Sequence, residues 1–101
     1  MAQFDVYKNI NNSSKDDIPY LLDIQNDILK NLSSRVVVPL VLNSKSAKIL
    51  NPIFEIENQK LIMSTAELAS ISSDKIGEKV CSLEKRRNEI IEAVDFLITG
   101  F

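Results

Sequence analysis

The sequence predicts an α+β domain in which an antiparallel β-sheet is followed by one C-terminal helix packed on it. Two observations lead to this prediction. Between residues 3 and 80, short segments rich in β-branched and aromatic residues alternate with polar, turn-forming stretches. Residues 82–101 instead place apolar side chains at helical spacing. A chain of 101 residues is expected to form a single domain over 1–101.

The expected strands follow one another with polar connections between them. A loop rich in Asn, Ser and Asp is expected at 8–17, and a second polar loop at 43–48. The connection 26–34 is expected to pack lightly, and 65–69 to form one helical turn. The expected strands lie at 3–7, 20–25, 35–42, 53–57 and 60–64, with one or two more within 71–80 around Gly77.

The segment 35–42, RVVVPLVL, is the most β-branched run and is expected to be the central long strand. Pro39 within it cannot donate a hydrogen bond to a β-ladder, so we expect a bulge, a bend or a local edge position there. The segments 53–57 and 60–64 are expected to form a hairpin around Asn58-Gln59.

Residues 82–101, SLEKRRNEIIEAVDFLITGF, form the only long helical pattern of the sequence. Ser82 is expected to cap its N-terminus, because a serine hydroxyl accepts a hydrogen bond from an unpaired N–H of the first turn. Gly100 is expected to end the helix in the left-handed conformation. The stripe expected to pack on the sheet consists of Leu83, Ile90, Val94 and Leu97.

The opposite face of this helix is mainly polar. At about 100° per residue, it is formed by Asn88, Ile91, Glu92, Asp95 and Thr99. The chain then ends in a large aromatic side chain, Phe101. Two interpretations of this end are open: Phe101 folds back onto the core, as buried phenylalanines do, or the face and the tail together bind a partner.

Composition excludes several classes of site. The net charge of −2 does not favour nucleic acid as the main partner. There is no histidine, so the commonest general base and metal ligand is missing, and with Cys81 as the one cysteine a zinc site is not expected. We expect no cofactor and no catalytic residue. A single cysteine also rules out an internal disulfide and suits a reducing cytoplasm.

No segment shows the features of a signal peptide or approaches the roughly 20 apolar residues that a membrane helix needs. Two weaker patterns remain. Asp23 and Asp27 are a possible acid–base pair, although solvated carboxylates are the more ordinary interpretation. The basic cluster at 85–87 is interpreted as a solvated face, with an acidic or nucleic-acid partner as the alternative.

Several segments taken together resemble one family. They are QFDVY at 3–7, LLDIQNDIL at 21–29, RVVVPL at 35–40, MSTAELASI at 63–71 and RNEIIEAVDFLITGF at 87–101. Their order and the chain length are similar to those of the CcdB toxins of toxin–antitoxin systems, and the similarity runs through almost the whole chain.

The resemblance implies a fold, partners and a mechanism. CcdB-like toxins are homodimers with an SH3-like antiparallel barrel, a small second sheet and a C-terminal helix. They act without enzymatic chemistry, by binding the A subunit of DNA gyrase and trapping the cleaved DNA complex. The disordered C-terminal segment of a cognate antitoxin neutralises them. Together with that antitoxin they repress their own operon, so they meet DNA only through the complex.

Carried over by position, the resemblance also implies a gyrase-facing surface. Its residues are Gln25, Asn26, Asp27, Ile28, Asn88, Ile91, Glu92, Asp95, Thr99, Gly100 and Phe101. The helical members coincide with the outward face found above from periodicity. The tail departs from the family's Trp-Gly-Ile, because Thr99 stands where the family has tryptophan. An aromatic contact worth about 1 kcal/mol is therefore missing at that position.

Two other functions are weighed against gyrase poisoning. MazF/Kid-type toxins share this fold and cleave RNA, which requires groups that activate a 2′-hydroxyl and stabilise phosphate charge. Fold alone does not decide between them. A toxin homologue that has lost activity and serves only as an antitoxin-binding co-repressor is the third possibility, which the change at Thr99 keeps open.

Overall fold

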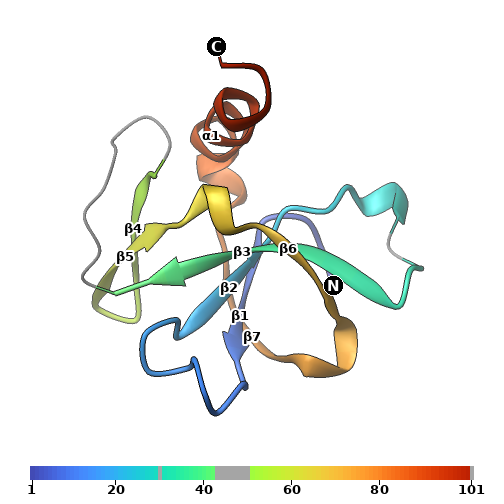
Figure 1. Ribbon diagram of the computed structural model, residues 1–101, viewed down its shortest axis with the longest axis vertical. Helices are drawn as coiled ribbons and strands as arrows, with labels where there is room; N and C mark the ends of the chain where they lie inside the picture. The colour runs from blue at the N-terminus through green and yellow to red at the C-terminus, as the bar shows by residue number, and fades with distance from the viewer. Residues whose placement is uncertain (30, 43–50, 101) are drawn as a thin grey trace.

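The computed structural model describes residues 1–29, 31–42 and 51–100. Within them, antiparallel strands form one curled sheet, and a single α-helix stands over one of its faces (Figure 1). This confirms the predicted α+β class. The polar loop predicted at 43–48 and the terminal Phe101 lie outside the described residues.

The strands follow the order β4-β5-β3-β2-β1-β7, and β6 lies beside β3. All pairings are antiparallel. The strands are β1 (Asp5–Asn9), β2 (Tyr20–Asp23), β3 (Ser34–Val41), β4 (Ile53–Ile56), β5 (Gln59–Met63), β6 (Ala69–Ser72) and β7 (Ile76–Ser82). The helical elements are the short 3₁₀ turns η1 (Asp27–Leu29), η2 (Thr65–Glu67), η3 (Ser73–Lys75) and η4 (Glu84–Arg86), and the helix α1 (Arg87–Thr99).

The long strand β3 is central, as predicted, and its outer side divides between two partners. Its C-terminal end pairs with β5 through Leu40 and its N-terminal end pairs with β6. Pro39 lies where these partners diverge, and its carbonyl accepts a hydrogen bond from the Ser64 N–H at 2.9 Å. Because a strand residue points its N–H and C=O to the same side, the missing donor of Pro39 faces this gap rather than β2. The local edge position predicted for the proline is confirmed.

Two predicted strand boundaries are wrong, at 3–7 and at 20–25. The first strand begins at Asp5, because Phe4 has a positive φ of 70° and turns the chain out of the extended conformation. The second strand ends at Asp23, where the chain leaves the ladder. The predicted hairpin between β4 and β5 is confirmed, but its turn centres on Glu57-Asn58, whose φ angles are both positive, rather than on Asn58-Gln59.

Successive side chains along the strands point to opposite faces of the sheet, so apolar residues form a cluster on each face. The main core lies between the sheet and α1 and contains Val6, Leu22, Val38 and Phe54 together with Ile90 of the helix. A smaller cluster fills the other side of the curl, with Tyr7, Leu21, Val37 and Ile76. The sheet is therefore covered on both faces over its central strands.

The C-terminal helix begins later than predicted. Ser82 is the last residue of β7, where it pairs with Asp5, and its hydroxyl accepts a hydrogen bond from the Glu84 N–H at 3.2 Å. The turn η4 follows, and α1 begins at Arg87 without a side-chain cap. The prediction of Ser82 as its N-cap is wrong because β-pairing extends through that residue.

The packing stripe of α1 is also shorter than predicted. Ile90 and Ala93 are buried, and Val94 and Leu83 pack partly on the core. Leu97, predicted to belong to the stripe, is 36% exposed and does not pack against the core cluster. Gly100 ends the helix as predicted: it has φ 78°, and its N–H donates to the Phe96 carbonyl at 2.9 Å.

Candidate partner-binding surface

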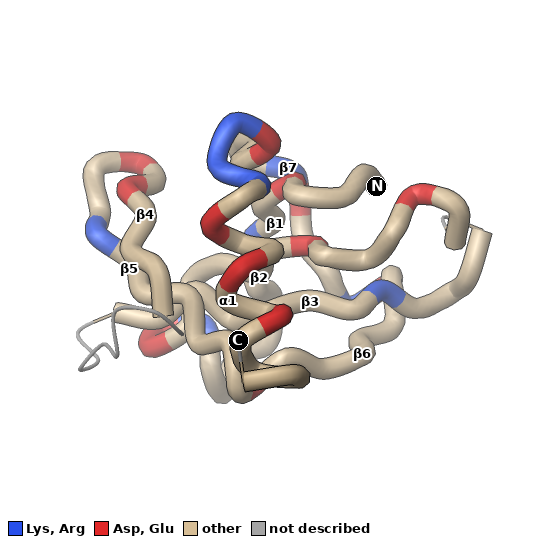
Figure 2. Tube along the Cα trace, turned by 90° about the horizontal axis from the view of Figure 1, so that it is seen from above, with Lys and Arg blue, Asp and Glu red and all other residues tan. Residues whose placement is uncertain are grey.

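The helical part of the predicted surface is exposed. Asn88, Ile91, Glu92, Asp95 and Thr99 are all exposed on α1. Two of these five residues, Glu92 and Asp95, carry carboxylates, and Ile91, directly before Glu92 in the sequence, adds an apolar side chain. Figure 2 shows acidic positions along this helix, viewed from above. This face therefore combines negative charge with apolar area.

A second exposed part comes from the loop after β2. Asn26, Asp27 and Ile28 are exposed, and Ile28 is 86% accessible, the most exposed of the large apolar side chains that the structure describes. The turn η1, which contains two of these three residues, has no buried residue. Leu29, beside Ile28, is also exposed, at 49%, so this turn presents two neighbouring apolar side chains to solvent.

Gln25 differs from the other residues of the predicted surface. It is only 6% exposed, and both ends of its side-chain amide bond to neighbouring backbone. The structure therefore does not place Gln25 in the exposed part of the loop, although it directly precedes that part in the sequence.

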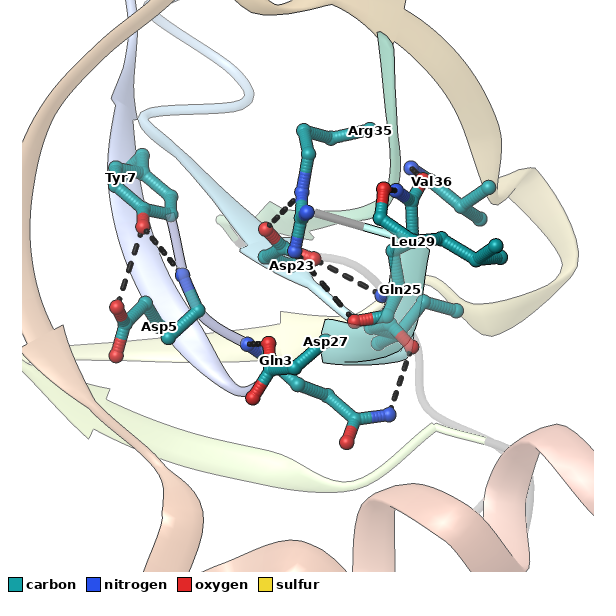
Figure 3. Close-up of polar contacts among 11 residues, drawn as sticks. Gln3, Asp5, Tyr7, Asp23, Gln25, Asp27, Leu29, Arg35 and Val36 are labelled. Atoms are coloured by element: carbon teal, nitrogen blue, oxygen red, sulfur yellow. Dashed lines mark hydrogen bonds and ion pairs between the residues drawn. The ribbon is translucent and has the colours of Figure 1, made fainter. Parts of the chain in front are cut away.

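A groove joins the loop side of this surface to the helix. It has a volume of about 190 Å³ and is lined by Gln3, Phe4, Ile24, Ile90, Ile91, Val94 and Asp95. Gln3 links it to the loop, because its Nε2 donates to the Ile24 carbonyl at 3.1 Å and its backbone N–H donates to Asp27 Oδ1 at 2.8 Å (Figure 3). The structure thus connects loop and helix through the N-terminal segment, a link that the sequence prediction did not contain.

The described part of the tail does not return to the core. Ile98 is 73% exposed, and Thr99 is exposed with its hydroxyl donating to the Asp95 carbonyl at 2.7 Å. Nothing lies within 4 Å of the position that a Cβ of Gly100 would occupy. The glycine is therefore required by its left-handed backbone rather than by a close neighbour. The position of Phe101 is outside the described residues.

The acid–base pair suggested for Asp23 and Asp27 does not form one site. Asp27 is exposed and accepts a hydrogen bond from Gln3, whereas Asp23 is fully buried and paired with Arg35 at 2.7 Å. Arg35 is itself 1% exposed. Neither partner of this ion pair can touch a substrate while the surrounding strands stay in place. Sequence reasoning missed the pair, although a charged residue at the end of each of two adjacent apolar segments was a visible signal.

The basic cluster at 85–87 is partly engaged within the chain. The Arg86 guanidinium lies 4.7 Å from the centroid of the Phe54 ring and pairs with Glu89 at 2.5 Å. This hydrogen bond is the main reason that the pKa of Glu89 is lowered and that of Arg86 raised. Arg87 lies over the Phe4 ring at 5.9 Å. These contacts favour a role in anchoring the start of α1 rather than in binding nucleic acid.

No group of three or more His, Cys, Asp or Glu residues suited to holding a metal ion occurs in residues 1–29, 31–42 and 51–100. Over the same ranges, no helix has both the length and the apolar character needed to cross a membrane.

Comparison with known proteins assigns the fold to a class. The structure superposes, with a TM-score of 0.76 and 12% sequence identity, on an endoribonuclease solved in complex with its cognate antitoxin from a Mycobacterial species. The match covers 97% of this chain and 94% of the other. The chain thus has the fold of a small protein that pairs with an antitoxin.

The sequence comparison is more specific. A family model described as CcdB protein matches residues 3–100, so this chain belongs to the CcdB family, and with it to the toxins of toxin–antitoxin systems. The family resemblance found in the sequence is confirmed.

Proposed function

We propose that this toxin binds the A subunit of DNA gyrase and traps the cleaved DNA complex, without an enzymatic step of its own. The observation that carries the proposal is that Gln3 links the exposed loop after β2 to α1: it donates a hydrogen bond to Asp27 and lines a groove together with Ile91 and Asp95. Ile28 and Ile91 supply its apolar contacts, and Asp27, Glu92 and Asp95 its negative charge. A few such residues commonly contribute most of the affinity of an interface.

The arrangement of ionisable groups supports a non-enzymatic mechanism. Asp23 and Arg35, the acid and base of the ion pair inside the sheet, are both buried. General acid–base catalysis needs such groups within hydrogen-bonding reach of a substrate. We therefore expect no cleavage of RNA by the purified protein. RNA cleavage that disappears on substituting one arginine or carboxylate would contradict this expectation.

We also propose that the antitoxin binds in a second groove, which is exposed and largely apolar. This groove, of about 570 Å³, is lined by Ile10, Ile18, Leu21, Pro39 and Ile71 with polar residues of the 9–14 and 70–75 segments around them. A disordered antitoxin segment can wrap such a surface, together with the 43–48 region and the helix, and fold as it binds. Hydrogen exchange should then slow in residues 8–16 and on α1 when antitoxin is added, and unchanged exchange there would exclude this placement.

A homodimer and operon repression with the antitoxin complete the proposal. Leu97 and Ile98 expose apolar area at the end of α1, which a second copy would cover. Antitoxin binding and gyrase poisoning are then expected to overlap but to be separable by substitution, because the antitoxin groove and the outer face of α1 are lined by different residues.

One observation favours a second function. The matched structure, whose fold this chain shares, is an endoribonuclease. A MazF/Kid-like ribonuclease activity is therefore the alternative, and an inactive toxin that acts only as a co-repressor is the third. The buried position of Asp23 and Arg35 weighs against the ribonuclease.

The test is a DNA cleavage assay with purified toxin and gyrase. Gyrase-dependent accumulation of cleaved DNA is expected, together with its loss in Ile91→Arg, which places a charge on the exposed face. Ile53→Arg, at another exposed isoleucine, on β4, is the matched control and should leave cleavage unchanged. Cleaved DNA that does not accumulate with several bacterial gyrases, or RNA cleavage in their absence, would refute gyrase poisoning. Thr99→Trp should strengthen poisoning if the family's aromatic contact is otherwise intact.

A further inference from the structure

The exposed loop after β2 has little apolar packing to hold its shape. Its turn η1 contains no buried residue, and Ile28 and Leu29 are both exposed. A segment without buried apolar contacts opens easily unless hydrogen bonds fix its backbone. The conformation in which Asn26, Asp27 and Ile28 are presented must therefore depend on polar contacts.

Gln25 supplies the contacts that tie this loop to the sheet. Its Oε1 accepts a hydrogen bond from the Val36 N–H of β3 at 3.0 Å. Its Nε2 donates to the Leu29 carbonyl, at the end of η1, at 2.8 Å (Figure 3). One buried amide thus connects the far end of the loop to the central strand.

Gln25 is itself fixed by the buried ion pair. Asp23 Oδ1 accepts from the Gln25 backbone N–H at 2.9 Å, while Asp23 Oδ2 accepts from Arg35 Nε at 2.7 Å. Arg35 Nη2 lies 3.5 Å from the Gln25 carbonyl oxygen. The register of the two strands explains this arrangement: Asp23 pairs with Val37, so Arg35 lies opposite Gln25 and diagonal to Asp23. A charged pair buried in one geometry gives Gln25 a rigid support.

We propose that Gln25 is a positioning residue of the gyrase-facing surface: supported by Asp23 and Arg35, its side-chain amide holds the 26–29 loop in the shape that the partner recognises. This rests on the proposed function. The family resemblance placed Gln25 among the contact residues, but its buried side chain acts through the loop and not by touching gyrase.

The first test is hydrogen exchange in the free protein. Gln25→Met keeps the length and removes both side-chain hydrogen bonds. Exchange at the Ile28 and Leu29 amides should become about 10- to 30-fold faster, because each lost bond is worth about fivefold. Amides of the β1–β2–β3 core should keep their protection. Gln59→Met, at an exposed glutamine of β5, is the matched control and should change neither.

The second test is binding to purified gyrase A subunit at a temperature where every variant is folded. Gln25→Met should weaken binding by about tenfold or more, in line with its loop exchange. Ile28→Ala should weaken binding without changing exchange, since it removes a contact and not a support. Gln25→Glu retains an acceptor for Val36, loses the donor to Leu29 and adds a carboxylate that repels the Leu29 carbonyl, so it should open the loop even if Gln25→Met folds poorly.

Unchanged exchange at Ile28 and Leu29 in both Gln25 variants would overturn the positioning role. Faster exchange with unaltered gyrase binding would overturn it too, because the shape of the loop would then not matter to the partner. If the unmodified chain binds no gyrase, the proposed function fails while the exchange data still decide whether Gln25 anchors the loop.

Discussion

Replacing Arg35 by methionine should destabilise the fold strongly, because it removes one partner of a buried ion pair. Asp23 is fully buried and Arg35 is 1% exposed, so the substitution would leave the aspartate in the protein interior without its partner. Breaking such a pair from one side typically lowers the free energy of unfolding by about 3–5 kcal/mol. Domains of this kind have about 5–15 kcal/mol in total, so the loss is a large fraction.

The contacts of the Arg35 guanidinium place the expected loss in free energy of unfolding at the low end of the range given above. Arg35 Nη1 is buried and has no hydrogen-bond acceptor among the residues that the structure describes. Burying an unpaired donor is unfavourable, and methionine removes that penalty along with the favourable bonds. We therefore expect about 3 kcal/mol, which lowers the melting temperature by on the order of 15 °C in a domain of this length.

Thermal and urea unfolding followed by far-UV circular dichroism measure this loss. The informative control is the double variant Asp23→Asn with Arg35→Met, which removes both charges and retains an oxygen for the Gln25 N–H. It should be more stable than Arg35→Met alone, by about 1–2 kcal/mol. If Arg35→Met unfolds within about 1 kcal/mol of the unmodified chain, or if the double variant is no more stable than the single one, the pair is not the buried support described above.

Three further predictions are open to direct measurement. Burial is the main cause that raises the pKa of both Tyr7 and Tyr20 to about 12, with Asp5 and Glu57 as acidic neighbours. Absorbance at 295 nm should therefore show both tyrosines ionising near pH 12 in the folded chain. Their contribution to the free energy of unfolding should be fully present below pH 10 and should be lost between pH 10 and pH 12, because the tyrosines of the unfolded chain ionise first. A tyrosine that titrates near pH 10 in the folded protein would contradict this. A chain truncated after Ile98 should lose about 1–2 kcal/mol or less in free energy of unfolding but lose toxicity in a growth assay. A much lower melting temperature would show that the tail belongs to the core, and retained killing would show that the tail is not the binding site. Light scattering at micromolar concentration should give the mass of a dimer, and a monomer mass would remove the proposed role of the apolar end of α1.

Features fixed by local sequence were predictable. The glycine that ends α1, the hairpin between β4 and β5 and the edge position of Pro39 each follow from the conformational limits of one or two residues. The exposed face of α1 followed from the period of the helix. Such features need no knowledge of which strand lies beside which.

Features that depend on strand register were not predictable in the same way. The burial of Gln25 and its support by Asp23 and Arg35 arise only when β2 and β3 pair with Asp23 opposite Val37. The packing stripe of α1 ends before Leu97, and where it ends is set by how the helix is placed on the sheet, which the helical period alone does not give. The N-cap predicted at Ser82 failed for a similar reason, since pairing with β1 carries β7 through that residue.

Residues 23–28 contain both buried residues that support the loop and exposed residues that a partner can reach. Asp23 and Gln25 point into the protein, where their hydrogen bonds fix the backbone, and Asp27 and Ile28 face outward. Substitution of an outward residue removes a contact and leaves the fold, whereas substitution of an inward one alters both. Loss of toxicity after a change at Gln25 or Asp23 is therefore not a sign of contact with the partner. Only a comparison of binding with loop exchange in the free protein separates the two, and the same argument applies to Gln3, which anchors Asp27 from the other side of the loop.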